Sequence, residues 1–296
     1  MTNLHSSVSK LALGTAQFGM QYGIANQVGQ VDRKTVKAML ELAAESNIDT
    51  LDTAIAYGDS EASLGESGIK SFKLITKLPA LPDACSDISE WVQQQVGASL
   101  DRLGTEVVYG LLLHRPDQLL GSYGKMLYRA LLELKEAGQV EKFGLSIYAP
   151  SELAAITRQY PVDLIQAPFN LIDRRLYTSG WLHKLKDEHV EVHTRSVFLQ
   201  GLLLMSQATI PAKFSPWANL WDSLHQWLST HQVSALQAAL NFPLSFPEVD
   251  RVVVGAESVN QLEQIINVAL NEVTDDLPDL RCEDDNLINP ARWSQL

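Results

Sequence analysis

Four residues that can do chemistry stand at the ends of apolar, strand-like segments in the first half of the chain. Asp52 lies inside one such segment and Tyr57 follows it, five positions later. Lys77 ends the segment that begins at 73, and His114 ends the segment that begins at 107. A carboxylate inside a buried strand is costly unless a cation is paired with it. An acid, a phenol, an ammonium and an imidazole at the ends of successive strands are the groups from which a barrel active site is built.

These four groups predict proton transfer to a carbonyl oxygen. A free phenol, with a pKa of about 10, is a poor acid at neutral pH, and a neighbouring ammonium favours its ionised form. We expect Asp52 to hold Lys77 in place beside Tyr57, which would act as the general acid. Hydride delivery to a carbonyl carbon places negative charge on the oxygen, and a neutral His114 would help to orient and stabilise it. The residues alone leave a second interpretation open, a buried Asp–Lys ion pair beside an unrelated tyrosine and histidine.

The elements that must position these residues alternate between strands and helices. Eight strand-sized apolar segments, each followed by a helical pattern, predict a parallel sheet. A closed (β/α)8 TIM barrel, formed as one domain by residues 1–296, is favoured over an open doubly wound sheet, because no dinucleotide-type glycine fingerprint follows the first strand. The strands are expected at 10–16, 48–54, 73–77, 107–114, 140–147, 162–170, 190–197 and 251–255.

The connection between the seventh and eighth strands, 198–250, is long for a barrel. It predicts a helical insertion with helices near 218–229 and 233–242. The tryptophans of this region are expected either to pack as core between the helices and the barrel or, in one case, to line a pocket. They are Trp217, Trp221 and Trp227.

Composition narrows the classes of function. The chain has 296 residues, of which 46% are apolar, and a net charge of −12, which disfavours general binding to nucleic acid or anionic membranes. No apolar run reaches the length of about 18 residues that a membrane span needs, and the start of the chain does not resemble a signal peptide. Cys85 and Cys282 form neither a disulfide framework nor a metal motif. We therefore expect a cytoplasmic protein without a metal site, as a monomer or weak oligomer.

The residues singled out above resemble those of the aldo-keto reductases. Segment 13–19 is similar to the family's opening strand, and segment 51–58 resembles its Asp-Thr-Ala-x-x-Tyr-Gly motif. Segments 76–77 and 113–117 resemble its lysine and histidine strand ends. The resemblance implies an NAD(P)H-dependent oxidoreductase acting on CH-OH donors and their carbonyl counterparts. It also implies a catalytic tetrad of Tyr57 as acid, Lys77 and Asp52 as its modulators, and His114 as the orienting residue.

The resemblance further implies a nicotinamide site at the ends of strands five and six. Ser146 and Gln166 match the residues that contact the nicotinamide amide. Ile147 is a departure, because the family usually has asparagine there.

The segment after strand seven resembles the part of the family that holds the rest of the cofactor. Arg195 replaces the aromatic residue that usually stacks on the nicotinamide; a planar guanidinium can stack as well, and the other interpretation is a solvent-facing charge. Ser196 matches the start of the pyrophosphate loop. Leu199, Gln200 and Gly201 match a cover over the cofactor.

The largest departure follows strand eight. Segment 254–264, with Gly255 and Gln261, resembles the family segment that binds the adenosine 2′-phosphate at a helix N-terminus. Glu257 stands where arginine is usual, and a carboxylate repels a phosphate but accepts a hydrogen bond from a ribose hydroxyl. NADP(H) is the cofactor that the family implies, and Glu257 makes NAD(H) the second candidate. In the other interpretation Glu257 points to water and another cation binds the phosphate.

Two functions from different classes remain. The first is a reductase that interconverts a small-molecule aldehyde or ketone and an alcohol, with a sugar-like carbonyl as one candidate substrate. The second is a non-catalytic, nucleotide-binding barrel that acts as a sensor or partner subunit, an alternative raised by the departures at Arg195 and Glu257. The substrate pocket is expected to involve the glycine-rich segment 14–23, Tyr22, Asn170, Arg174, Arg175 and the 198–250 connection.

Overall fold

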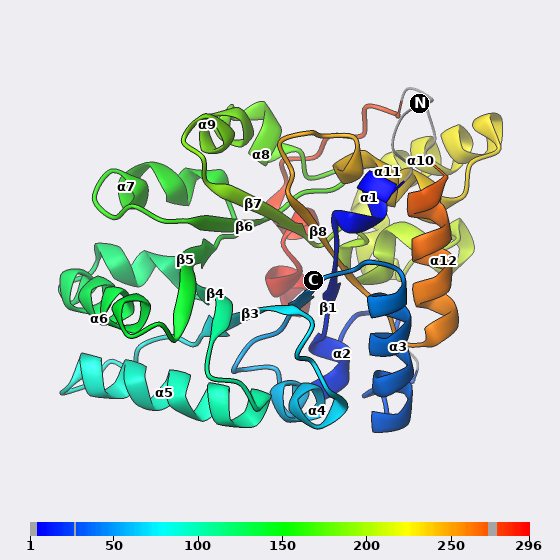
Figure 1. Ribbon diagram of the computed structural model, residues 1–296. Coiled ribbons are helices and arrows are strands. Elements are labelled where there is room, and N and C mark those ends of the chain that lie inside the picture. Colours follow the sequence, from blue (N-terminus) through cyan, green and yellow to red (C-terminus); the bar gives the residue numbers. More distant parts are fainter. Residues whose placement is uncertain (1–4, 27, 272–276) are drawn as a thin grey trace.

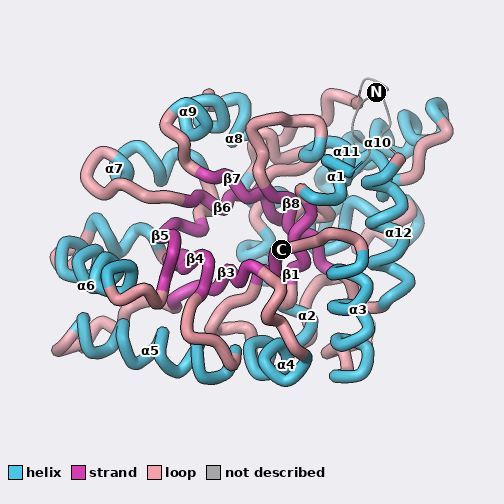
Figure 2. The backbone as a smooth tube through the Cα atoms, viewed as in Figure 1, coloured by secondary structure: helices cyan, strands magenta, loops and turns pink. Residues whose placement is uncertain are grey.

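The computed structural model describes residues 5–26, 28–271 and 277–296. Eight parallel strands close into a barrel in sequence order, and helices surround the ring (Figure 1, Figure 2). Pairing of β1 with β8 closes the ring, which confirms the predicted (β/α)8 barrel. The strands are β1 (Leu11–Gly14), β2 (Thr50–Asp52), β3 (Lys73–Leu78), β4 (Val108–Leu113), β5 (Val140–Ser146), β6 (Leu164–Pro168), β7 (Glu191–Arg195) and β8 (Arg251–Gly255).

Helices follow the strands as the sequence pattern predicts. The main ones are α3 (Arg33–Glu45), α4 (Ser60–Ser67), α5 (Ile88–Leu103), α6 (Gly124–Glu136), α9 (Trp181–Asp187) and α12 (Val259–Leu270). Shorter helices are α1 (His5–Ser9), α2 (Ala16–Gly19), α7 (Leu153–Thr157), α8 (Arg175–Thr178) and α13 (Asp285–Ile288).

Side-chain caps explain where two of the long helices begin. The carboxylate of Asp32 accepts hydrogen bonds from the backbone amides of Lys34 and Thr35, so α3 begins at the residue after it. The hydroxyl of Ser258 accepts from the amide of Gln261 at the start of α12.

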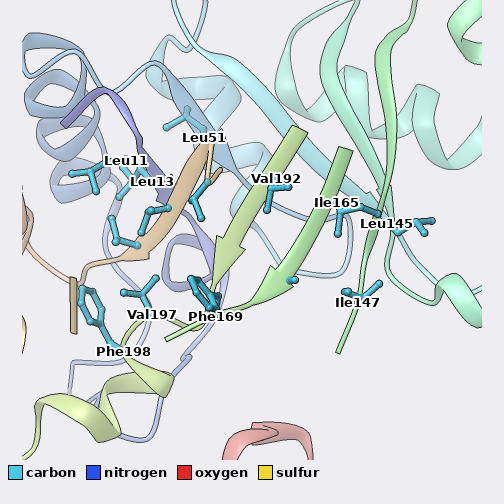
Figure 3. Close-up of a cluster of buried hydrophobic side chains, with 14 of the residues drawn as sticks. Leu11, Leu13, Leu51, Leu145, Ile147, Ile165, Phe169, Val192, Val197 and Phe198 are labelled. Carbon is cyan, nitrogen blue, oxygen red and sulfur yellow. The ribbon is translucent and has the colours of Figure 1, made fainter. Parts of the chain in front are cut away.

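The core lies in two places. Most buried apolar side chains form one cluster between the strands and the surrounding helices, and Figure 3 shows part of it, including Leu13 of β1, Leu145 of β5 and Val192 of β7. Ile75 of β3 and Leu164 of β6 belong to a separate small cluster, in which side chains from distant strands meet inside the ring. Alternate residues of a strand point to the same side, so the residues two positions after these, Lys77 and Gln166, also face the interior of the barrel.

The connection between β7 and β8 carries helices α10 (Ala218–His231) and α11 (Ala235–Leu244) near the expected ranges. That this connection is an insertion stays a prediction. The indole of Trp221 is buried and donates to the carbonyl of Phe214, and that of Trp217 donates to Asp284. Within the described residues no tryptophan lines the cavity of the barrel mouth, so the tryptophans of this segment serve packing.

In the parts of the chain that the structure describes, the helices are too short or too polar to cross a membrane.

Candidate active site

A buried ion pair lies at the carboxyl ends of β2 and β3. The Nζ of Lys77 lies 2.7 Å from Oδ1 of Asp52 and donates a second 2.7 Å hydrogen bond to the backbone carbonyl of Thr53. Both charged side chains are almost fully buried. Burial disfavours the charged ammonium, yet the Asp52 carboxylate and the nearby Tyr57 outweigh it and raise the pKa of Lys77 above its ordinary value. The lysine is therefore a fixed cation.

Tyr57 and His114 lie beside this pair, at the mouth of the barrel. The Nζ of Lys77 is 5.1 Å from the centroid of the Tyr57 ring. The rings of Tyr57 and His114 meet edge to face, with centroids 6.1 Å apart. Burial, with smaller effects of Lys77 and Arg195, lowers the pKa of His114 from 6.5 to about 4, so the imidazole is neutral at physiological pH. The structure thus brings the four residues singled out in the sequence together.

Two glycines fix the backbone around Tyr57. A Cβ added at Gly19 would lie 1.8 Å from the carbonyl oxygen of Tyr57, and one added at Gly58 would lie 2.4 Å from the carbonyl oxygen of Gly19. Gly58 also has a φ of 55°, in the left-handed region that favours glycine. The turns after β1 and β2 therefore pack backbone against backbone.

Ser146 and Gln166 are both buried at the ends of β5 and β6, but they face different neighbours. Ser146 lines the cavity at the mouth. Gln166 lies outside the lining, and its Nε2 donates a 2.6 Å hydrogen bond to Oδ2 of Asp52. The Oε1 atom of Gln166 is buried without a partner in the structure. A buried acceptor without a partner costs about 1–3 kcal/mol, so this atom is an unusual feature next to the Asp52–Lys77 pair.

Arg195, the last residue of β7, is half-buried rather than solvent-facing. Its Nη2 donates 2.9 Å to the carbonyl of Ile147, and its Nη1 lies 3.2 Å from the hydroxyl of Ser196. Its guanidinium carbon lies 4.8 Å from the centroid of the Tyr148 ring. Arg195, Ser196 and Tyr148 all line the cavity.

The loop after β7 packs against the loop after β1. Gly201 has a φ of 89°, and a Cβ there would lie 2.5 Å from the Cβ of Ala25. Gln200 and Gly201 line the cavity, whereas Leu199 is fully buried in the core and lies outside the lining. The backbone of Leu199, with a φ of 46°, shapes the loop without its side chain reaching the cavity.

The far end of the cavity lies at the start of α12. Gly255, Glu257 and Gln261 line it there. The backbone amide of Glu257 donates a 2.8 Å hydrogen bond to the side chain of Gln261, and partial burial raises the pKa of the Glu257 carboxyl. A Cβ at Gly255 would lie 2.6 Å from the Gln17 side chain, so this glycine leaves room for that residue.

One cavity of about 660 Å³ connects these groups, from Tyr57 and His114 to the first turns of α12. The glycine-rich segment and Tyr22 line it as expected. Asn170, Arg174 and Arg175 do not. Sequence reasoning missed Tyr148, which lies in the connection after β5, where the only available signal was its position just beyond a strand end.

The three residues that fall outside the lining are held elsewhere. The side chain of Asn170 donates to the carbonyl of Ser196, and Arg174 bonds the carbonyls of Leu171 and Pro278. Arg175 pairs with Asp173 and Asp285.

Comparisons with known proteins agree with this architecture. The sequence model of the Aldo/keto reductase family matches residues 10–278, and the chain belongs to this family of oxidoreductases. It is 29% identical over 231 residues to oxidoreductase sirO of Leptosphaeria maculans, covering 75% of this chain and 68% of the relative. It is 27% identical to D-threo-aldose 1-dehydrogenase of a Pseudomonas species, covering 88% and 92%. The holo form of aldo-keto reductase AKR11C1 from Bacillus halodurans has the same fold, with a TM-score of 0.73, 20% identity, and coverage of 92% and 89%.

Proposed function

We propose that this protein reduces an aldehyde or ketone to an alcohol with a nicotinamide dinucleotide, and that Tyr57 is the general acid. The observation that carries the proposal is the geometry of the mouth: a buried Lys77–Asp52 pair lies behind Tyr57, and a neutral imidazole lies beside it. Nothing in a purely structural ion pair requires a phenol and an imidazole on the same cavity wall.

Each residue has a distinct part in the proposed reaction. Asp52 holds the ammonium of Lys77, and the ammonium stabilises the charge left on Tyr57 when its phenol gives a proton to the carbonyl oxygen. His114, neutral above about pH 4, can donate a hydrogen bond to the same oxygen without competing as an acid. When bound, the dinucleotide supplies the hydride.

The residues present fit such a cofactor. The unpaired Oε1 of buried Gln166 and the hydroxyl of Ser146 lie at the ends of neighbouring strands, where an amide of the nicotinamide would bind. The flat guanidinium of Arg195 lines the same wall, and Ser196 follows it at a backbone φ of 59°. Gly201 belongs to the loop that would cover the dinucleotide. Gly255, Glu257 and Gln261 would hold the adenosine end.

The cofactor we propose is NADP(H) or NAD(H), and Glu257 supports the second. Among the described residues that line the cavity, Glu257 is the charged residue at the proposed adenosine end. Arg195 lies at the other end, and no second arginine and no lysine belongs to this lining. A carboxylate repels a 2′-phosphate and accepts a hydrogen bond from a 2′-hydroxyl.

The substrate we propose is a small carbonyl compound that carries hydroxyl groups. The side chains of Gln17, Gln200 and Tyr22 supply hydrogen-bonding groups to the cavity wall. One relative is named for an aldose substrate, which supports the same class. An aldose and an apolar aldehyde of similar size, compared by kcat/KM, test this: the aldose should be the better substrate.

The decisive experiment is replacement of Tyr57 by phenylalanine in the full chain. With a reactive aldehyde such as 4-nitrobenzaldehyde and reduced dinucleotide, kcat should fall at least about a hundredfold, because only the proton donor is removed. Dinucleotide affinity, measured by calorimetry, should stay unchanged. The exposed Tyr123, replaced in the same way, is the matched control and should retain full activity.

Two results would count against the proposal. Equal turnover by Tyr57→Phe and the parent would show that Tyr57 is not the general acid. A parent protein that binds dinucleotide but turns over no carbonyl compound would favour the sensor or partner-subunit alternative.

A further inference from the structure

Arg195 places an uncompensated positive charge in the wall of the cavity. A guanidinium stays protonated in proteins. Its hydrogen-bond partners are the neutral carbonyl of Ile147 and the neutral hydroxyl of Ser196. Among the described residues no carboxylate oxygen lies within 4.0 Å of its nitrogens. The other cation of the site, Lys77, is neutralised by Asp52, so Arg195 leaves this end of the cavity with a net charge of about plus one.

The contacts of Arg195 determine which part of the guanidinium is available to a ligand. An anion is best recognised by two parallel N–H groups on the guanidinium edge. Here Nη1 and Nη2 each make one hydrogen bond to a protein oxygen, and Nε is buried without a partner. The guanidinium carbon lies 4.8 Å from the centroid of the Tyr148 ring. Arg195 lines the cavity, and a flat guanidinium face there is suited to a planar ring.

The charge of Arg195 reaches the catalytic groups. Burial and Lys77 lower the pKa of His114 most, and the charge of Arg195 lowers it further. The same charge is among the influences on the pKa of Lys77 and of Tyr22. A charge that is felt at the imidazole is felt by any ring bound between Arg195 and Tyr57.

We infer that Arg195 makes this site discriminate between the oxidation states of the nicotinamide, binding the reduced dinucleotide more tightly than the oxidised one. The inference rests on the proposed function and adds to it a residue that determines specificity. The reduced ring is neutral and the oxidised ring carries a positive charge, which a guanidinium in a partly buried site repels. An aromatic side chain at this position would act in the opposite sense, because its face attracts cations.

This discrimination favours turnover in the direction of reduction. In the proposed reaction Tyr57 would give its proton to the carbonyl oxygen and a bound dinucleotide would supply the hydride to the carbonyl carbon, so that the carbonyl becomes an alcohol and the dinucleotide becomes oxidised. Arg195 would then face a positively charged ring, and its guanidinium would weaken the binding of the oxidised dinucleotide.

The test is the ratio of two dissociation constants, oxidised over reduced, measured by calorimetry without substrate. The probes are NAD⁺ and NADH, and then NADP⁺ and NADPH. In the parent protein the ratio should be at least tenfold, a difference of about 1.4 kcal/mol. Arg195→Gln keeps a flat, polar side chain without the charge and should lower the ratio at least tenfold. Arg195→Lys keeps the charge and should retain most of the ratio, and Arg195→Trp should reverse it.

The outcomes separate this inference from the proposed function. An unchanged ratio in Arg195→Gln, or an equal loss of affinity for both oxidation states, would mean that Arg195 is only a contact, and would overturn the inference while leaving the reductase proposal standing. Failure of the parent to bind any of the four dinucleotides would overturn both. Thermal unfolding of each variant shows that the comparison is made between folded proteins.

Discussion

Gln166 on β6 donates a 2.6 Å hydrogen bond to Oδ2 of Asp52 on β2, from the opposite side of the barrel. Lys77 occupies the other oxygen of the same carboxylate. The carboxylate is therefore held from both sides, and its orientation does not depend on the lysine alone.

Replacing Gln166 by leucine should lower the free energy of unfolding by about 1–3 kcal/mol, because a buried carboxylate oxygen would lose its donor. Urea denaturation measures this. The matched control is Gln94→Leu on the exposed face of α5, which should change stability by about 0.5 kcal/mol or less. Equal effects of the two substitutions would show that the bond across the barrel contributes nothing.

His114 should make stability depend on pH between about 6.5 and 4. In that window the unfolded chain binds a proton at this residue, whereas the folded chain does not until the pH approaches 4. Stability from this residue is therefore complete above pH 6.5 and is lost as the pH falls. His114→Gln should remove this slope from the free energy of unfolding, and replacement of the exposed His231 should leave it in place. Parallel pH profiles for the parent and His114→Gln would contradict the lowered pKa.

Glu257→Arg should shift dinucleotide preference toward NADPH. The substitution replaces a repulsive carboxylate with a cation that can pair with the 2′-phosphate. The ratio of the dissociation constants for NADPH and NADH should fall at least about tenfold, with Glu257→Gln between the two. Glu263→Arg, on the exposed side of α12 and outside the cavity lining, makes the same change in net charge and should leave the ratio unchanged. If the parent already binds NADPH more than tenfold tighter than NADH, Glu257 does not weaken that preference.

Gly201→Ala should loosen the cover over the cavity. Alanine meets two penalties there, a left-handed backbone and a Cβ that would lie 2.5 Å from that of Ala25. Gly104→Ala isolates the first penalty, because Gly104 has a φ of 64° and nothing within 4 Å of an added Cβ. Gly201→Ala should therefore destabilise by more than the roughly 1 kcal/mol expected for Gly104→Ala, and it should weaken dinucleotide binding.

The double variant Gly201→Ala/Ala25→Gly should recover the stability that Gly201→Ala loses beyond the loss in Gly104→Ala, because it removes the Cβ of residue 25. Stability and calorimetric affinity measure both effects. If the double variant is no better than Gly201→Ala, the contact between the two loops does not hold the cover.

The barrel could be predicted from the sequence because burial imposes a clear pattern. Apolar runs of strand length recur eight times, and the bounds of β8 agree with those expected. The ends of the weaker elements were less predictable. The helical pattern expected after the fifth strand corresponds to a 3-10 turn at Pro150–Glu152 and the short α7, and α13 near the end of the chain carries no strong periodicity.

The meeting of Asp52, Tyr57, Lys77 and His114 was predictable, because charged groups in apolar strands are rare and the ends of parallel strands meet at one end of a barrel. The directions in which individual side chains point could not be predicted from the sequence. Gln166 turns toward Asp52, and Leu199 turns into the core, because each is decided by neighbours distant in the chain. Tyr148 contributes to the wall only through the path of its loop, which no local pattern encodes.

Gly19 and Gly58 pack backbone against backbone, so the placement of Tyr57 and the shape of the cavity can be altered independently. The backbone of Tyr57 is held by main-chain contact, so it does not depend on the cavity-lining side chains at positions 20, 22, 200 and 204. A library that randomises those four positions while keeping both glycines would sample new cavity shapes around an unchanged Tyr57. The same library with residue 19 randomised would mostly contain inactive members, because a Cβ there displaces the carbonyl of Tyr57.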